Sequence, residues 1–340
     1  MSNGIDKLNK RYSGIIRMPG TYAPDDIEYI PTGSLALDFA IGNPVKRCGF
    51  PIGLITTIWG KEGSGKSTLG VSGMAQAQKM DERFTALINT ELRQDFEYAQ
   101  RIGVDLNRMA LVQQDAGSDI FGEQISDAIS EMAKSGDFSY ILLDSVAALE
   151  PKNMTEAETA ESAPGLHARL VRKMLSKVIE KLKAGRTALV ITTQRIASFG
   201  SHSFAGPSYE IVGGNRLKFY SSLLLQTSMI SRVKEGDDVI GIETRVEMQK
   251  NIGVPYARPS FCITDGLGID WARELIDLGK PYNIAYNKGA WYYYTDSDTG
   301  EEVTIGQGAR NAVEFLRSNP EIADKLRERI ITALEGNDAD

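Results

Sequence analysis

The chain has 340 residues, of which 42% are hydrophobic and 24% charged, a composition typical of a soluble globular protein with one large core and a smaller domain. No apolar stretch is long enough to cross a membrane or to form a secretory signal, and the two cysteines, Cys48 and Cys262, lack the spacing of a zinc site or a disulfide framework, so we expect a cytoplasmic protein. The net charge of −7 argues against nucleic-acid binding through overall charge.

The first 33 residues form a polar segment that ends at Gly33. Apolar residues at helical spacing occur there only at Ile5, Leu8 and Tyr12, and so short a helix cannot bury itself. We therefore expect residues 1–33 to be an arm that docks on the core of the same chain or on a neighbour.

From residue 34 to residue 267, apolar runs alternate with amphipathic segments. Five runs are expected to be strands: Leu54–Trp59, Phe84–Asn89, Met109–Gln113, Tyr140–Leu143 and Ala188–Thr193. Helical spacing of apolar residues predicts helices over Asp119–Ser135 and Gly165–Lys183. This alternation indicates an α/β fold with a mostly parallel, twisted sheet flanked by helices. Further strands are expected at Ser222–Gln226, Val239–Lys250 and Ser260–Ile263.

The first strand leads into a complete phosphate-binding loop, residues 60–67, and then into a helix-like stretch. Glycines let the loop curl so that its N–H groups point at phosphate oxygens, and the positive end of the helix faces the same anion. In this motif Lys66 reaches the β- and γ-phosphates and Ser67 ligates Mg²⁺. ATP and Mg²⁺ are the expected cofactors, and the expected phosphate-site residues are Gly60, Glu62, Gly63, Ser64, Gly65, Lys66, Ser67 and Thr68.

Other strands also end in functional side chains, at the edge where open α/β sheets bind ligands. Asp144 follows a strand at the Walker B position and is expected to help bind nucleotide by holding Mg²⁺. Glu91 is the candidate to orient or deprotonate the attacking water. Gln194 is neutral, which suits sensing of a γ-phosphate through a hydrogen bond, and a buried structural glutamine is the alternative.

Two segments at this edge, 151–164 and 195–214, lack the spacing of helices or strands. Long loops in compact domains are usually functional or disordered, and nucleotide state could order these two because both follow strand ends. The second contains Arg195 and Phe199, residue types that contact phosphates and bases. Between the loops, residues 165–186 carry seven basic residues and one acidic residue, for which a solvated helix face is the simpler explanation.

The pattern changes after residue 267. A short helix (Trp271–Leu278), an aromatic hairpin (Trp291–Tyr294 with Thr295–Gly300) and a final helix over Ala309–Leu334 predict a small α+β domain over residues 268–340. Its last six residues, 335–340, form a short acidic tail that is expected to fray.

Taken in this order, the motifs resemble the bacterial and phage RecA recombinases over nearly the whole chain. The resemblance rests on the phosphate-binding loop and on five further segments: Ile30–Asp38, Leu143–Leu149, Gly213–Asn215, Val233–Gly236 and Gly289–Tyr292. A generic P-loop ATPase would match only the Walker segments. The resemblance implies a RecA-type ATPase core with an N-terminal arm and a small C-terminal domain. It also implies a DNA-dependent ATPase that forms a helical filament on single-stranded DNA and pairs it with homologous duplex.

The resemblance also implies roles for single residues. Glu91 corresponds to the catalytic glutamate of the family, Gln194 to the glutamine that links the γ-phosphate to the second DNA loop, and Lys250 to a lysine that reaches ATP across the protomer boundary. Asp95 and Tyr98 match residues on the adenine side, with Tyr98 similar to the ring that stacks on the base. The expected catalytic residues are Lys66, Glu91, Gln194 and Lys250.

Segments 151–164 and 195–214 correspond to the two DNA-binding loops of the family. Expected DNA contacts are Pro164, Gly165, Arg169, Arg172, Lys173, Arg195, Phe199, Gly213, Gly214 and Asn215. Phe219 corresponds to an aromatic residue of the filament interface, and Lys218 lies beside it in the sequence. The expected partners are single- and double-stranded DNA, further copies of the chain, and single-strand-binding and loader proteins, but no membrane.

The chain departs from the family in two positions that matter for these roles. Family members carry a second interface lysine two residues after Lys250, where this chain has Ile252, and Lys218 is the candidate to compensate. Pro164 stands in place of an apolar methionine that inserts between bases, whereas Phe199 matches the inserting position of the second loop. The acidic tail is also short, which argues against autoinhibition by the tail.

Three other functions share part of this pattern. A RecA-core motor, such as a replicative-type helicase or a circadian-type hexamer, would form a closed ring, and the matches outside the nucleotide site argue against it. A DNA-binding mediator would use ATP only as a switch, but the chain retains Ser67, Glu91 and Asp144. A small-molecule kinase is least supported, because nothing marks an acceptor pocket.

Overall fold

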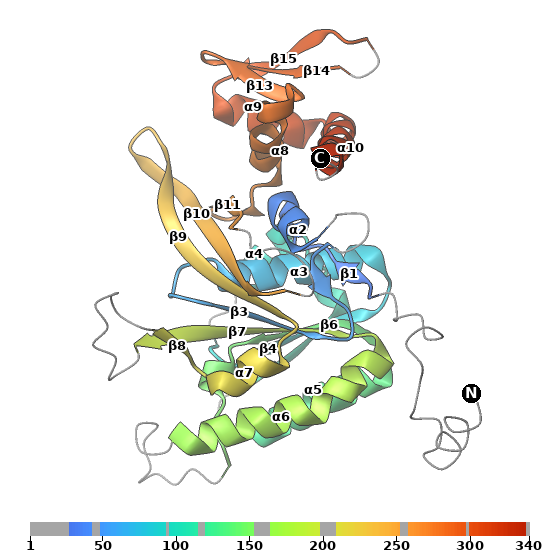
Figure 1. Cartoon of the computed structure of the whole chain (residues 1–340), viewed down its shortest axis with the longest axis vertical. Coiled ribbons are helices and arrows are strands. Elements are labelled where there is room, and N and C mark those ends of the chain that lie inside the picture. The colour runs from blue at the N-terminus through green and yellow to red at the C-terminus, as the bar shows by residue number, and fades with distance from the viewer. Residues whose placement is uncertain are drawn as a thin grey trace, which may run out of the picture.

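The computed structural model describes residues 27–42, 48–92, 95–114, 120–152, 164–197, 209–251, 258–296 and 299–337. Residues up to Asp270 form a large α/β unit, and a smaller unit that starts at Trp271 stands at one end of it (Figure 1). Residues 1–26 of the expected arm lie outside the described residues. The next residues belong to the core, because β1 (Tyr29–Ile30) pairs with β2 (Phe50–Pro51) and Ile30 is buried.

One large sheet runs through the α/β unit in the strand order β12-β11-β10-β9-β3-β7-β6-β4-β5, and β8 pairs with β7. Its strands are β3 (Ile55–Gly60), β4 (Phe84–Asn89), β5 (Met109–Gln113), β6 (Phe138–Asp144), β7 (Ala188–Ala197), β8 (Tyr209–Ile211), β9 (Leu223–Glu235), β10 (Asp238–Lys250), β11 (Ser260–Thr264) and β12 (Gly268–Ile269). The pairs from β9 through β3, β7, β6 and β4 to β5 are parallel, and the remaining pairs are antiparallel. The prediction of a mostly parallel sheet is confirmed.

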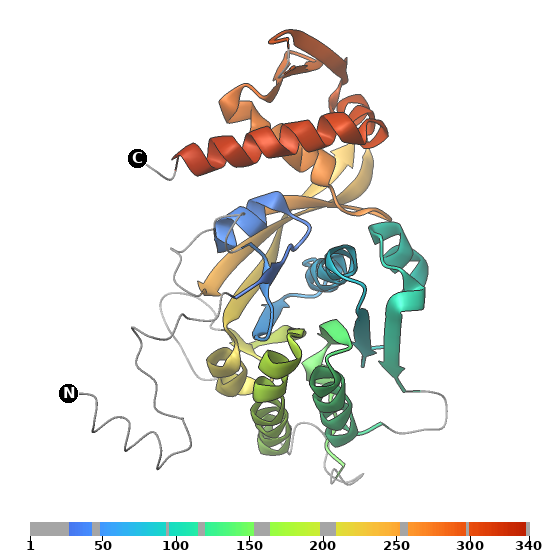
Figure 2. The same ribbon diagram turned by 90° about the vertical axis from the view of Figure 1, so that its right-hand side faces the viewer.

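Helices cover both faces of the sheet (Figures 1 and 2). One face carries α2 (Leu35–Ile41), α3 (Lys66–Met80) and α4 (Phe96–Ile102), and the other carries α5 (Gly122–Ser135), α6 (Pro164–Gly185) and α7 (Gly214–Tyr220). Because side chains alternate along a strand, Ile58 of β3 packs with Leu69 and Met74 of α3, whereas Ile55 belongs to the core beneath α5 and α6. Each face of the sheet therefore has its own apolar core.

The five predicted core strands are present, and the structure also lengthens β9 and β7 and adds β8. β9 continues nine residues beyond the predicted end at Gln226, as one half of a ribbon with β10 that projects from the sheet (Figure 1). Residues 195–197, expected in a loop, extend β7, and residues 209–211 form β8 beside them. Residues 227–235 are mostly polar, so pairing with β10 rather than composition makes them a strand. Residues 153–163 and 198–208, most of the two expected DNA loops, lie outside the described residues.

The small unit consists of α8 (Trp271–Gly279), a 3-10 turn (Lys280–Tyr282), β13 (Ala285–Lys288), β14 (Trp291–Thr295), β15 (Glu302–Gln307), α9 (Ala309–Ser318) and α10 (Pro320–Asn337). The large unit has two further 3-10 turns, Leu106–Arg108 and Val146–Ala148. Its three strands form an antiparallel sheet, and Leu275, Leu316 and Ile330 lie in a separate core. The prediction of one final helix was wrong. The helix is interrupted at Asn319 because Pro320 lacks an N–H and disfavours helical geometry in the residue before it.

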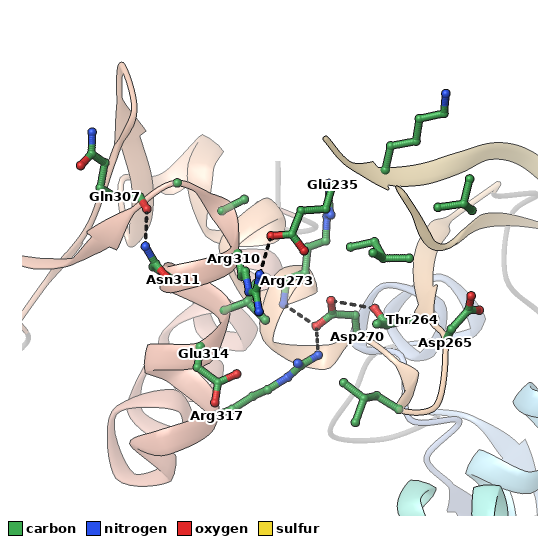
Figure 3. A pocket seen from close by; sticks show the side chains of 17 residues that line it. Glu235, Thr264, Asp265, Asp270, Arg273, Gln307, Arg310, Asn311, Glu314 and Arg317 are labelled. Atoms are coloured by element: carbon green, nitrogen blue, oxygen red, sulfur yellow. Dashed lines mark hydrogen bonds and ion pairs between the residues drawn. The ribbon is translucent and has the colours of Figure 1, made fainter. Parts of the chain in front are cut away.

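A buried carboxylate joins the two units. Glu274 of α8 accepts hydrogen bonds from the hydroxyl of Ser34 at 2.6 Å and from the backbone N–H of Leu35 at 2.7 Å, so it caps the N-terminus of α2. Beside this junction, α9 faces the end of the β9–β10 ribbon across a cleft of about 840 Å³ (Figure 3). Arg310 donates to Glu235 across the cleft at 3.1 Å.

Candidate nucleotide-binding site

The phosphate-binding loop joins β3 to α3 at the carboxyl edge of the sheet. Gly65, the N-cap of α3, has φ of +85°, a left-handed conformation that favours glycine. A Cβ atom at Gly60 would lie 2.4 Å from the carbonyl oxygen of Thr227, so the close approach of β9 also requires glycine. Ser64 stabilises the loop from within, because its hydroxyl donates to the carbonyl of Lys61 at 2.6 Å and lies 2.7 Å from the hydroxyl of Thr227.

Lys66 is the cation of this loop. Its ammonium group donates to the carbonyl oxygen of Lys61 at 2.9 Å, and the residue is only 9% exposed. Burial lowers the pKa of Lys66, and the charges of Asp144, Glu91 and Glu62 act in the opposite direction. We expect a bound phosphate to replace the Lys61 carbonyl as the partner of this ammonium group.

The candidate Mg²⁺ ligands are oxygen donors at the start of α3 and at the end of β6. Ser67 is exposed in the first turn of α3, whereas Asp144 is 9% exposed and accepts a hydrogen bond from the hydroxyl of Thr192. No group of three or more His, Cys, Asp or Glu side chains that could hold a metal occurs among the described residues. One hydroxyl and one carboxylate fit Mg²⁺, which takes its other ligands from water and substrate phosphates.

Glu91 and Gln194 meet at the same edge, as the sequence predicted for strand ends. The side-chain amide of Gln194 donates to Oε1 of Glu91 at 3.3 Å, and the hydroxyl of Ser145 donates to the same oxygen at 2.7 Å. The peptide bond between Asp144 and Ser145 is cis. Gln194 is exposed, so the alternative of a buried structural glutamine was wrong. In the pairing of β3 with β7, Gly60 is the partner of Gln194, which places the phosphate loop and this cluster at one level.

The expected adenine-side residues lie on α4. Asp95 caps this helix by accepting the backbone N–H of Tyr98 at 2.9 Å, and the hydroxyl of Tyr98 lies 3.1 Å from that of Thr68 in α3. Burial raises the pKa of the Tyr98 hydroxyl, so it remains protonated and can donate. Tyr98 therefore links α4 to the first turn of the phosphate helix, and its stacking on a base stays a prediction.

Lys250 and Phe219 lie toward the other end of the strands, away from the phosphate-binding loop. Lys250 pairs with Leu224 in β9, and Leu224 pairs with Thr57, three residues before the loop begins at Gly60. This places the lysine roughly 10 Å from the loop along the strands, at 3.3 Å per residue. Its ammonium group donates to the carbonyls of Phe219 at 3.0 Å and Lys218 at 3.3 Å, and the Phe219 side chain is 73% exposed. Lys250 is not part of the phosphate site of its own chain.

The expected DNA residues on α6 face a basic groove of about 630 Å³. Its lining includes Arg169, Arg172 and Lys173 of α6 and Arg216 of α7. Arg216 was not among the predicted DNA contacts, although its place directly after the Gly-Gly-Asn turn was a usable signal. Gly213 and Gly214 have φ of +99° and +75° and begin α7, with Asn215 and Gly165 exposed. Phe199 and the side chain of Pro164 lie outside the described residues.

Several residues with hydroxyl groups near the carboxylates of Glu91 and Asp144 were also not predicted from the sequence. Thr90 and Ser145 follow the ends of β4 and β6, and Thr192 lies within β7. Nothing in the sequence says which side chain or backbone group each hydroxyl contacts. Ser145 donates to Glu91, Thr192 donates to Asp144, and Thr90 bonds the backbone of Ser145, and all three contacts depend on strand order.

The region around Lys66 combines a buried strand, a glycine turn and a helix N-terminus, and acidic residues lie at neighbouring strand ends. These features define a P-loop nucleoside triphosphatase core. Residues 1–270 match the family model described as the RecA N-terminal domain, and residues 273–335 match the RecA C-terminal domain. The chain therefore belongs to the RecA family, whose recombinases and ATPases use nucleotide, bind DNA and form filaments. Within the described part of the chain, no helix has the length and apolarity needed to span a bilayer.

Proposed function

We propose that this chain is a DNA-dependent ATPase that assembles into a helical filament on single-stranded DNA and pairs the bound strand with homologous duplex. The observation that carries the assembly is the separation of Lys66 and Lys250 toward opposite ends of the strands. If Lys250 of one protomer completes the phosphate site of the next, the contact joins two different surfaces. Such head-to-tail contacts propagate into filaments unless their rotation closes a ring.

The hydrolytic chemistry follows from the residues at the carboxyl edge. The ATP phosphates would lie on the loop N–H groups and on Lys66, and Ser67 and Asp144 would hold Mg²⁺, which neutralises phosphate charge. A water oxygen then bonds to the γ-phosphorus while the bond from that phosphorus to the ADP oxygen breaks. Glu91 orients this water and takes its proton, so that the products are ADP and phosphate.

The path of β7 supports a coupling between nucleotide and DNA. Gln194 lies beside Glu91, and β7 continues through Arg195 to Ala197, which are the first residues of the expected DNA loop. The chain then returns as β8, next to β7, and reaches Gly213 at the start of α7. A γ-phosphate that draws Gln194 away from Glu91 would therefore act on a strand pair whose far end carries the DNA loop and whose return leads to the basic groove.

Electron microscopy of negatively stained protein tests this proposal. Protein is imaged with single-stranded DNA and a slowly hydrolysed ATP analogue, and compared with samples that lack one ligand. Long helical filaments only with both ligands support the proposal, and a strand-exchange assay with homologous and heterologous duplex then tests pairing. Closed rings, or unassembled particles that release phosphate from ATP, would contradict it and favour a RecA-core ring motor.

A further inference from the structure

Thr90 and Ser145 lie opposite each other, one residue beyond the paired ends of β4 and β6. The parallel register of these strands pairs Asn89 with Asp144, and the backbone N–H of Thr90 donates to the Asp144 carbonyl at 3.0 Å. The two strands therefore stay in contact one step past the sheet, beside Glu91.

The Thr90 hydroxyl binds both polar backbone groups of Ser145. It accepts the Ser145 N–H at 2.8 Å and donates to the Ser145 carbonyl at 2.7 Å. Ser145 is only 1% exposed, so water has little access to replace these bonds, and a buried backbone group without a partner is costly. One side chain thus determines where the Ser145 backbone lies.

The Ser145 side chain in turn contacts Glu91. Its hydroxyl donates to Oε1 of Glu91 at 2.7 Å, and Gln194 donates to the same oxygen at 3.3 Å. Oε2 of Glu91 forms no hydrogen bond with any described residue. Two donors on one oxygen orient the carboxylate and leave the other oxygen available to accept a proton from water.

We propose that Thr90 is a positioning residue for ATP hydrolysis, acting through Ser145 on the Glu91 carboxylate. The inference rests on the proposed function in one respect, the role of Glu91 toward the attacking water. A carboxylate that loses its orientation binds nucleotide as before but meets the water in productive geometry less often. Small misplacements of catalytic groups cost up to about 100-fold in rate.

The test compares two variants. Thr90→Val keeps the shape of the side chain and removes the hydroxyl, whereas Thr90→Ser retains the hydroxyl. Thr187→Val is the matched control, because the Thr187 hydroxyl also donates to a backbone carbonyl of β6, that of Phe138 at 2.7 Å, but at the opposite edge of the sheet. DNA-stimulated phosphate release gives kcat and KM. We expect kcat of Thr90→Val to fall roughly 10- to 100-fold, with KM for ATP within about 2-fold and with rescue by Thr90→Ser.

Two further measurements separate positioning from loss of stability. In a Glu91→Gln background, Thr90→Val should not lower kcat further, because residues that act through one group are not additive. Amide hydrogen exchange at Ser145 should accelerate in Thr90→Val but not in Thr187→Val, whether or not the protein hydrolyses ATP. An unchanged kcat in Thr90→Val, additive losses in the double variant, or an unchanged Ser145 exchange rate would each overturn the inference. A wild-type chain without ATPase activity would instead refute the proposed function.

Discussion

The side-chain amide of Gln194 lies 3.3 Å from the carboxylate of Glu91, although 103 positions separate the two residues in the chain. The contact exists because β4 and β7 flank β6, so their carboxyl ends reach one edge of the sheet. Glu91 is thereby linked to the strand that leads into the second expected DNA loop. We expect Glu91 and Gln194 to have separate roles in hydrolysis, and substitution of Glu91 tests the first of these roles.

Replacement of Glu91 by Gln removes the proton acceptor and keeps the size of the side chain. We expect nucleotide affinity within about 3-fold of wild type and a fall in kcat of roughly 10²- to 10⁴-fold, the usual contribution of a general base. Phosphate release and titration with a fluorescent ATP analogue measure the two quantities. Glu97→Gln, an exposed change on α4, is the control, and retained turnover in Glu91→Gln would remove Glu91 from this role.

Replacement of Lys66 by Ala removes the buried cation of the phosphate loop. We expect nucleotide affinity to fall about 10- to 100-fold, because a hydrogen bond to a charged group is worth about 1.5–3 kcal/mol, and nucleotide-dependent assembly to disappear. Isothermal titration and electron microscopy measure these effects. Lys79→Ala, at the exposed C-terminal end of the same helix, should behave as wild type. Normal filaments of Lys66→Ala on DNA would contradict the assignment.

A mixture of two inactive variants tests whether Lys250 acts on a neighbouring protomer. Lys250→Met and Glu91→Gln should each lose most DNA-stimulated hydrolysis. In an equal mixture, about a quarter of head-to-tail contacts combine an intact Glu91 with an intact Lys250 from the next protomer, so about a quarter of wild-type activity should return. If Lys250 acted on its own chain, no mixed site would be complete and the mixture would remain inactive.

The exposed ring of Phe219 is expected to serve assembly rather than folding. Because the side chain is 73% exposed, Phe219→Ala should change the free energy of unfolding by no more than about 0.5 kcal/mol while abolishing filaments. Urea unfolding and sedimentation with DNA and an ATP analogue give the two readouts. Leu267→Ala, at a side chain that is 45% exposed beside the small unit, is the matched control and should still assemble. Unimpaired assembly of Phe219→Ala would place the interface elsewhere.

Asp38 makes the stability of the chain depend on pH. Burial, and secondarily the charge of Glu274, raise the pKa of Asp38 from 3.8 to about 7, against the effect of the hydrogen bond from the Thr32 N–H. The folded state therefore favours the protonated acid, and the contribution of this group to the free energy of unfolding falls as the pH rises from about 4 through about 7.

Asp38→Asn keeps an acceptor for the Thr32 N–H and removes the titration. Relative to wild type, we expect this variant to be more stable at pH 8 than at pH 5, which urea unfolding at the two values measures. Glu321→Gln, an exposed change on α10, should show the same difference from wild type at both pH values. An equally flat difference for Asp38→Asn would show that Asp38 does not titrate in this range.

Local sequence was sufficient for the phosphate loop and the main strands. The geometry of the phosphate loop depends on glycines that lie within a few residues of one another in the sequence, and Gly65 takes the left-handed conformation that the motif requires. The central strands β3, β4 and β6 are short, mostly apolar runs that are almost entirely buried, so composition alone marked them. The β9–β10 ribbon was only partly predictable, since residues 227–235 are mostly exposed and are held as a strand by pairing with β10.

By itself, the sequence determined the α/β class and the family, from patterns and motifs spread along the chain. It also determined the positions of Lys66, Glu91, Asp144 and Gln194 at strand and helix ends, because each of these positions follows from neighbours within a few residues. Only the tertiary structure decided that Thr90 holds Ser145, that Ser145 holds Glu91, and that Glu274 caps α2. These contacts join residues 54 to 239 positions apart. A hydroxyl or a carboxylate can serve many partners, and strand order and domain packing select the one that it meets.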